Sequence, residues 1–340
     1  KSWKGRYSAG DQATWNNNKH LCQEIGYDAR AAAKVDDGVF WISWVDVLRY
    51  FQNLHLSWNP SLFKYRINTH AFWPLTMGPK EDTFNVGENP QYILSFSDEV
   101  VAKKPTVWIL LSRHVTKQEQ EGEEATDFLT VNVHRGQGMA HRIWYPSSKT
   151  TVVSGAYSNN PHVLARYDVT EPADKYLSLV LSQYERSNDL TYTLSCYCTE
   201  DFGISRPAKD LPVSVQLKGR WGEHSAGGPA GSKTFDKNPM WAVQLKKETH
   251  IQARVSSVNS FAVNVMLVPV DRPGKRIKHL TTKPPVDSGS YRHGFAVAET
   301  HKVPAGDYTL VLSTFEPHQL GAFVVDLFST SGLKVNQIRS

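Results

Sequence analysis

The sequence predicts a mainly β protein in which two tandem antiparallel β-sandwiches follow a short α+β segment. Three observations support this fold class. From Asn89 onward, short runs of β-branched and aromatic residues are separated by turn residues, and no long helical pattern intervenes, which is typical of antiparallel sandwiches. A long internal repeat indicates that the sandwich is duplicated. The first sixty or so residues differ, because they mix helical and extended patterns.

The length and composition agree with several globular domains. The chain has 340 residues, of which 40% are hydrophobic and 21% are charged, and a single core rarely grows beyond about 250–300 residues. The net charge of +5 is small and no basic recognition motif is present, so we expect no nucleic-acid binding. Three cysteines are too few for a disulfide-stabilised scaffold and favour a reducing compartment. No apolar run approaches the roughly 20 residues that span a bilayer.

The N-terminal segment predicts short helices and one buried strand. Residues 13–33 contain little Gly or Pro and predict one or two short helices. The β-branched and aromatic run at 39–44 predicts a buried strand. Residues 46–51 again predict a helix, and Pro60 ends the pattern because the residue before a proline avoids the helical conformation.

The strands of the first sandwich are predicted from five runs with alternating or continuous apolar character. These runs cover residues 91–96, 107–111, 128–133, 176–181 and 190–195. Gly, Pro, Asn and Asp separate them, as expected for strands joined by turns.

The internal repeat predicts the second sandwich. The sequence Leu-Val-Leu-Ser-Gln-Tyr-Glu at 179–185 is matched by Leu-Val-Leu-Ser-Thr-Phe-Glu at 310–316, and Asn89-Pro90 is matched by Asn238-Pro239. A period this long indicates a duplicated domain rather than a solenoid unit. We therefore predict three parts, residues 1–65, 66–205 and 206–340.

Several motifs resemble the calpain proteases. Trp-x-Gly-x-Tyr-Ser at 3–8, Trp15-Asn16 and Asp-Gly-Val-Phe-Trp at 37–41 resemble the end of a calpain protease core. Ser-Ala-Gly-Gly at 225–228, followed by Asn238-Pro239, resembles the start of a calpain-type β-sandwich. Tandem sandwiches with no calcium-binding helix-loop-helix domain after them resemble the PalB-like (calpain-7 type) branch. This resemblance implies that residues 1–65 complete a papain-like core, and that the sandwiches have calcium/lipid-binding-domain-like topology.

The resemblance also implies a catalytic mechanism whose residues we do not expect in this chain. Calpains use a Cys nucleophile, a His base and an orienting Asn, all of which precede the Trp3 motif in the family. We therefore predict no catalytic residue and no cofactor here, and no activity of this chain alone. Cys22 lies in a predicted helix, whereas Cys196 and Cys198 alternate along one strand and so point to one face. We interpret all three as packing residues.

A calcium site in the core is implied by the family but is degraded in this sequence. The positions that carry its acidic ligands in the family are occupied here by Ser2, Ala9, Asp37 and Val39. Calcium needs about six to eight oxygen ligands, and only Asp37 supplies a carboxylate. We therefore predict no metal at this site.

Two charged segments are candidate contact surfaces. A basic stretch in the second sandwich either contacts anionic lipid head groups or a partner, or is a mobile surface loop. Residues 117–124 are acidic, and they form either a calcium- or core-contacting loop or a solvated hairpin loop. The predicted contact residues of the basic stretch are Arg272, Lys275, Arg276, Lys278 and Lys283.

The sequence as a whole predicts a non-catalytic C-terminal region of a calpain-like intracellular cysteine endopeptidase that performs limited proteolysis. The sandwiches would support the core, regulate it, and recruit substrate, partner or membrane. Expected partners are the remainder of the protease core, protein substrates, an anionic membrane surface and, through a missing N-terminal region, ESCRT-III-type endosomal sorting proteins. The expected location is cytoplasmic, with endosomal association or a nuclear location as alternatives. The alternative function is a tandem-sandwich scaffold that binds protein or anionic lipid independently of proteolysis.

Overall fold

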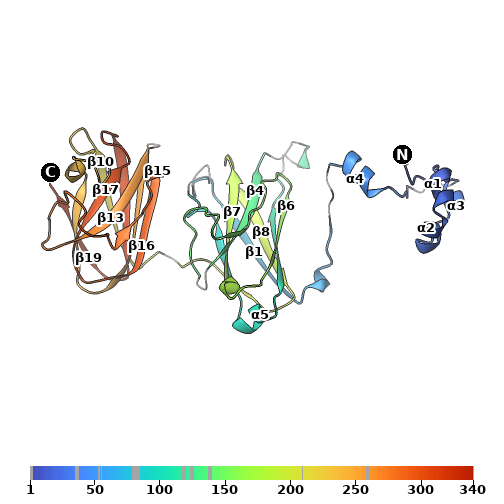
Figure 1. Cartoon of the computed structure of the whole chain (residues 1–340), viewed down its shortest axis with the longest axis horizontal. Helices are drawn as coiled ribbons and strands as arrows, with labels where there is room; N and C mark the ends of the chain where they lie inside the picture. The colour runs from blue at the N-terminus through green and yellow to red at the C-terminus, as the bar shows by residue number, and fades with distance from the viewer. Residues whose placement is uncertain are drawn as a thin grey trace. The chain divides into compact units, whose positions relative to one another are not determined.

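The computed structural model describes residues 3–34, 38–52, 54, 56–78, 85–116, 120–122, 126–136, 140–208, 210–257 and 261–339. The chain divides into two compact units, residues 1–62 and 63–340. Figure 1 shows short helices in the first unit (blue) and two β-sandwiches in the second (green to red). Among the described residues, no helix is long and apolar enough to cross a membrane.

The first unit consists of short helices, and side chains cap the N-termini of three of them. Asp11, Asp28 and Ser43 accept hydrogen bonds from backbone N–H groups of the first helical turns, which satisfies donors that the helix itself leaves unpaired. The helix predicted at 46–51 is confirmed, whereas the region 13–33, predicted to form one or two short helices, forms three. The elements are α1 (Gln12–Asn17), α2 (Lys19–Glu24), α3 (Ala29–Ala32), α4 (Trp44–Tyr50) and the 3₁₀ helix η1 (Pro60–Leu62).

Trp15 is the centre of a small aromatic core in this unit. Its side chain is buried, and its Nε1 donates a hydrogen bond to the Ser8 carbonyl at 2.8 Å. The ring packs against Tyr7 and Tyr27, with centroid distances of 5.3 and 4.7 Å. A buried indole whose N–H is satisfied contributes both apolar burial and orientation.

The predicted strand at residues 39–44 is wrong. This segment has no strand conformation, and Trp44 instead begins α4. Val39 and Trp44 are 69% and 60% exposed, so the segment is not buried either. In the described part of this unit no other segment forms a β-strand, and a strand needs a neighbour that pairs its backbone N–H and C=O groups. Aromatic and β-branched content alone therefore did not determine the conformation.

The first sandwich contains two antiparallel sheets (Figure 1). All five strands that the sequence predicted in it are present, and the sequence missed the four others. One sheet has the order β1 (Tyr65–Trp73), β8 (Leu190–Cys198), β3 (Thr106–Arg113), β6 (His162–Asp168). The other has the order β5 (Thr151–Val153), β4 (Phe128–Arg135), β7 (Tyr176–Tyr184), β2 (Gln91–Ser95), β9 (Gly203–Ser205). Helices α5 (Asp98–Ala102) and η2 (Pro172–Lys175) connect strands.

The second sandwich repeats this strand order and adds one short strand. Its first sheet has the order β10 (Val213–Trp221), β18 (Gly321–Ser329), β12 (Thr249–Ser257), β16 (Phe295–Val303). Its second sheet has the order β14 (Val286–Asp287), β13 (Ala262–Val270), β17 (Gly306–Thr314), β11 (Met240–Leu245), β19 (Leu333–Ile338). β15 (Arg292–His293) also pairs with β13, and η3 (Phe235–Lys237) precedes β11. The two tandem antiparallel sandwiches predicted from the sequence are confirmed.

The matched sequence motifs occupy equivalent places in the two sandwiches. The backbone N–H of Leu181 donates to the Pro90 carbonyl at 3.0 Å, and Leu312 N–H donates to the Pro239 carbonyl at 3.2 Å. These bonds attach the Asn-Pro corner to the strand that carries the Leu-Val-Leu motif, which is β7 in the first copy and β17 in the second. The repeat therefore marks the same corner of the fold twice.

Asn238 organises this corner in the second sandwich. Its side chain is completely buried, accepts a hydrogen bond from Gly227 N–H at 3.0 Å and donates to the Gly228 carbonyl at 2.7 Å. Position 227 has no room for a side chain, because a Cβ there would lie 2.1 Å from the Thr234 carbonyl oxygen. Gly228 has a φ of +76°, which favours glycine. The Gly-Gly pair is thus a tight turn.

Replacing Asn238 by Ala should destabilise the second sandwich. The change leaves the Gly227 N–H and the Gly228 carbonyl without their partner, and each unsatisfied buried group costs about 1–3 kcal/mol. We expect the urea concentration at the midpoint of unfolding of this sandwich to fall. Circular dichroism and tryptophan fluorescence measure this midpoint. Asn336→Ala, at an exposed position on β19, is the matched control and should change stability by less than about 0.5 kcal/mol. Equal effects of the two substitutions would contradict the role assigned to Asn238.

Candidate functional site

The predicted basic contact residues all lie in the connection between β13 and β14, residues 271–285, which we call the basic loop. Ile277 is buried and anchors this loop. It packs on side chains of β11, β13 and β17 that face away from the main sandwich core, namely Met240, Met266, Val268 and Val311, together with Phe235. The loop therefore covers the outer face of this sheet.

Arg276 attaches the basic loop to the neighbouring backbone. Its Nε donates to the Asp236 carbonyl at 2.8 Å, and its Nη2 donates to the Asn238 carbonyl at 2.7 Å. Its Nη1 lies 3.3 Å from the carbonyl of Ile338 near the end of the chain. Burial lowers the pKa of Arg276, but a guanidinium stays charged in proteins. This residue therefore holds the loop rather than presenting a charge to solvent.

The other cations of the loop are directed to the surface. Lys275 pairs with Asp271 at 2.9 Å, while its backbone carbonyl accepts a hydrogen bond from Thr309 Oγ1 at 2.7 Å. Arg272, Lys278 and Lys283 are exposed. The structure thus places all five predicted residues in one anchored loop and separates an anchoring residue from surface cations.

The cysteines of β8 are packing residues. Cys196 and Cys198 are both buried in the core of the first sandwich, so their predicted placement on one face is confirmed. Burial raises the pKa of Cys196 to about 12 and also raises the pKa of Cys198. Because the thiolate is the reactive form of cysteine, these two thiols are unreactive at neutral pH. Cys22 lies in α2, as predicted, and is half-buried.

The degraded calcium positions are only partly described. Ser2 and Asp37 lie outside the described residues, as do most of the acidic residues of segment 117–124. Ala9 and Val39 are described and carry apolar side chains. The nearby Asp11 carboxylate caps α1 and accepts hydrogen bonds from Thr14 N–H and Tyr7 N–H. The Thr14 side chain, with a smaller effect of these backbone bonds, lowers the pKa of Asp11. The absence of a calcium site stays a prediction.

A contact between the sandwiches was not predicted from the sequence. Residues 140–147, which we call the joint loop, belong to the connection between β4 and β5 and reach β12, β15 and β16. The Trp144 ring stacks on Phe295 with a centroid distance of 6.2 Å. Tyr145 Oη accepts a hydrogen bond from Val297 N–H at 2.6 Å, and Arg292 lies over the Tyr145 ring. The Arg-x-Trp-Tyr sequence at 142–145 could have indicated this contact, because large aromatic residues are enriched at interfaces.

Arg254 of β12 is the central residue of this contact. Its guanidinium lies 4.5 Å from the Trp144 ring centroid and 4.3 Å from that of Phe328. It forms an ion pair with Asp210 in the connector between the sandwiches and lies 3.8 Å from Glu88 of the first sandwich. One cation thus links the connector, the first sandwich and the joint loop.

His134 of β4 is another buried group near the joint loop. Its Nδ1 lies 3.2 Å from Thr151 Oγ1, and its ring lines a cavity together with Val86, Pro146 and Tyr157. Burial, together with a smaller effect of the nearby His141 of the joint loop, lowers the pKa of His134 to about 4. The ring is therefore neutral at neutral pH.

Comparison with known proteins identifies the family. The profile of the family described as calpain large subunit, domain III, matches residues 217–328, within the second sandwich. Calpain-7 of Mus musculus is 33% identical over 99% of this chain, which covers 40% of that protein. The chain belongs to the calpain-like family. The calpain-like protease palB of Emericella nidulans is 29% identical over 89% of the chain and 35% of that protein, so the predicted PalB-like branch is confirmed. The chain spans about 40% of the length of these calpain-7 relatives.

Solved structures add no further argument. A peptide-N(4)-(N-acetyl-beta-D-glucosaminyl) asparagine amidase covers 80% of this calpain-like chain, but with a TM-score of 0.22 and 9% identity. The assignment of calpain-type sandwiches therefore rests on the family profile, the relatives and the repeated topology.

Removing the Arg254 side chain should loosen the joint between the sandwiches. Arg254→Ala removes the contact with Trp144 and the pairing with Asp210, and a loss of about 1–2 kcal/mol raises the open population by about 5- to 30-fold. We expect faster trypsin cleavage in the connector between β9 and β10, measured by mass spectrometry. Arg220→Ala, at an exposed position on β10, is the control and should leave the cleavage rate unchanged. An unchanged rate for Arg254→Ala would show that the joint does not depend on this residue.

The stability of the first sandwich should depend on pH through His134. The unfolded chain binds this proton below about pH 6.5, whereas the native ring binds it only near its pKa of about 4. The contribution of neutral His134 to the free energy of unfolding is therefore fully present above about pH 6.5 and is lost as the pH falls towards 4. We expect His134→Gln to reduce this slope in urea titrations, and His162→Gln, at an exposed position on β6, to leave it unchanged. A slope that survives His134→Gln would assign the pH dependence to other groups.

Proposed function

We propose that this chain is the support and recruitment part of a calpain-like intracellular cysteine endopeptidase that makes limited cuts in proteins. The observation that carries the proposal is an anchored basic loop on the second of two like sandwiches, which the joint loop holds in contact. Such a unit presents a charged surface from a rigid frame, and rigid presentation lowers the entropy cost of binding. The peptide-bond chemistry itself belongs, in this proposal, to residues of the protease core outside this chain.

Support of the protease core is assigned to the first unit. Its segment from Trp41 to Leu62 exposes many large apolar side chains, including Trp44, Leu48 and Trp58. A contiguous exposed apolar segment marks an interaction surface. We propose that the remainder of the protease core covers it, because the calpain-7 relatives are more than twice as long as the matched region.

Recruitment is assigned to the basic loop, with an anionic membrane surface as the ligand. Each cation near an anionic membrane contributes about 1 kcal/mol, so Arg272, Lys278 and Lys283 together would contribute about 3 kcal/mol. This corresponds to roughly a hundredfold in affinity. Because the loop is anchored by Ile277 and Arg276, the three charges are held close to one side of the sandwich.

Reversing the three surface charges should abolish sedimentation with anionic liposomes. We compare phosphatidylcholine vesicles with and without phosphatidylserine, using Arg272→Glu/Lys278→Glu/Lys283→Glu. The matched control Lys218→Glu/Arg220→Glu/Lys334→Glu makes the same change in net charge at exposed positions of the same sandwich. We expect the loop variant to lose about a hundredfold in affinity and the control to lose far less. Equal losses would mean that only net charge matters, and unchanged binding by the loop variant would refute lipid recruitment.

A scaffold that acts independently of proteolysis is the second candidate function. It is favoured by the contacts that hold the sandwiches together, because these come from residues 63–340 alone. The two proposals differ in what they require of the complete protein. If the sandwiches alone restore the phenotype that is lost when the complete protein is removed, the scaffold is supported. If restoration requires an intact Cys, His and Asn in the core, the endopeptidase is supported. ESCRT-III-type proteins are proposed as partners through a region outside this chain.

A further inference from the structure

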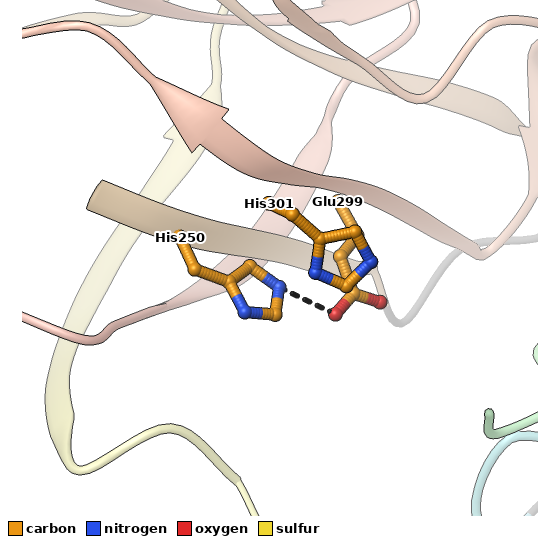
Figure 2. A group of neighbouring side chains, drawn as sticks. All are labelled: His250, Glu299 and His301. Carbon is orange, nitrogen blue, oxygen red and sulfur yellow. Dashed lines mark hydrogen bonds and ion pairs between the residues drawn. The ribbon is translucent and has the colours of Figure 1, made fainter. Parts of the chain in front are cut away.

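Two histidines and a glutamate meet on the surface of the second sandwich (Figure 2). His250 belongs to β12, and Glu299 and His301 belong to the neighbouring strand β16. One potential ligand atom from each residue lies within 4.8 Å of the others. His250 Nε2 is 2.8 Å from Glu299 Oε1, and the two imidazole centroids are 4.3 Å apart.

The strand register explains why the three side chains converge. Thr249 pairs with Val303 and Ile251 pairs with Thr300, so β16 has one extra residue opposite His250. A bulge of this kind redirects side chains and is common next to functional sites. Ala298 and Ile251 point into the core, so the alternation of side chains directs Glu299 and His250 to the opposite face of the sheet.

Neighbouring groups hold the ligand side chains in place. Gln252, which is buried, donates from Nε2 to Glu299 Oε2 at 2.9 Å and accepts from Arg254 Nε at 2.7 Å. The other carboxylate oxygen, Oε1, is thereby directed towards His250, as Figure 2 shows. The His250 backbone exchanges hydrogen bonds with Thr330. Hydrogen-bond partners that orient metal-binding side chains in this way are typical of metal sites.

We propose that His250, Glu299 and His301 bind a divalent transition metal of the zinc class. Two imidazoles and a carboxylate match zinc chemistry, with a fourth position left for water or for a donor atom from a partner. Tetrahedral zinc places its ligand atoms about 3.3 Å apart, so rotations of the side chains suffice to close the site. Calcium does not fit, because it requires about six to eight oxygen ligands.

The bound ion would link β16, which lies at the edge of its sheet, to β12. The same two strands carry Arg254 and Val297, which contact the joint loop. Gln252 connects the metal ligand Glu299 to Arg254 directly. Metal binding should therefore stabilise the second sandwich on the face that meets the first.

Calorimetry with zinc tests the proposal on the complete 340-residue chain, without a histidine tag and after treatment with chelator. We expect one zinc per chain at this site, and an electronic absorption spectrum of tetrahedral type when cobalt replaces zinc. His301→Ala and Glu299→Gln should weaken zinc binding at least about tenfold. Glu299→Gln keeps the acceptor oxygen and the shape, and His301 is exposed, so neither variant should fail to fold. His224→Ala, at an exposed position after β10, is the matched control and should bind zinc as the parent does.

A second measurement separates the site from other zinc ligands on the chain. Zinc should raise the melting temperature of the second sandwich in the parent and in His224→Ala, because it binds the folded state. The shift should disappear in His301→Ala. Failure of the parent to bind zinc, or equal affinity of the parent, His301→Ala and Glu299→Gln, would overturn the proposal. The three residues would then be a hydrogen-bonded surface group.

Discussion

Burial of alternate side chains between two facing sheets is the constraint on which the rest of this molecule depends. Each sandwich has one continuous core, and in both the first strand pairs with the next-to-last, β1 with β8 and β10 with β18. This pairing joins strands that are far apart in the sequence and so holds each sandwich together. The connections between strands can therefore vary without changing the fold. The basic loop and the joint loop are such connections, and the bulge of β16 opposite His250 is a local change in one strand.

Arg254 shows how the outward faces are used. Its guanidinium forms an ion pair with Asp210 and lies near Glu88. The same group packs on the rings of Trp144 and Phe328. A planar guanidinium can pair with carboxylates while its face stacks on aromatic rings. Through Gln252 the same residue is connected to Glu299. The contact between sandwiches and the histidine cluster therefore share one row of side chains on β12.

Much of the fold and part of the candidate site were predictable from the sequence. Alternating apolar runs identified the five central strands of the first sandwich, because burial of every second residue leaves a local pattern. The repeat of Leu-Val-Leu and Asn-Pro identified the second sandwich, and motif resemblance identified the calpain-like family. The four strands that were missed, β1, β5, β6 and β9, all lie at the edges of their sheets, and β5 and β9 have only three residues each. Residues 39–44 were wrongly predicted to form a strand. An aromatic and β-branched run does not show whether a neighbouring strand is present to pair with it.

The sequence alone determined the fold class, through its alternating apolar runs, and the duplication, through its internal repeat. It also indicated that Cys196 and Cys198 lie on one face of a strand, because side chains alternate along a strand. Only the tertiary structure decided what the charged residues do. Arg276 lies within a basic run, yet its guanidinium binds backbone carbonyls of residues about forty positions earlier. His250 and His301 are about fifty residues apart in the sequence, and the cross-strand register alone brings them together. The physical reason is that side-chain partners across strands depend on register, which a local pattern does not specify.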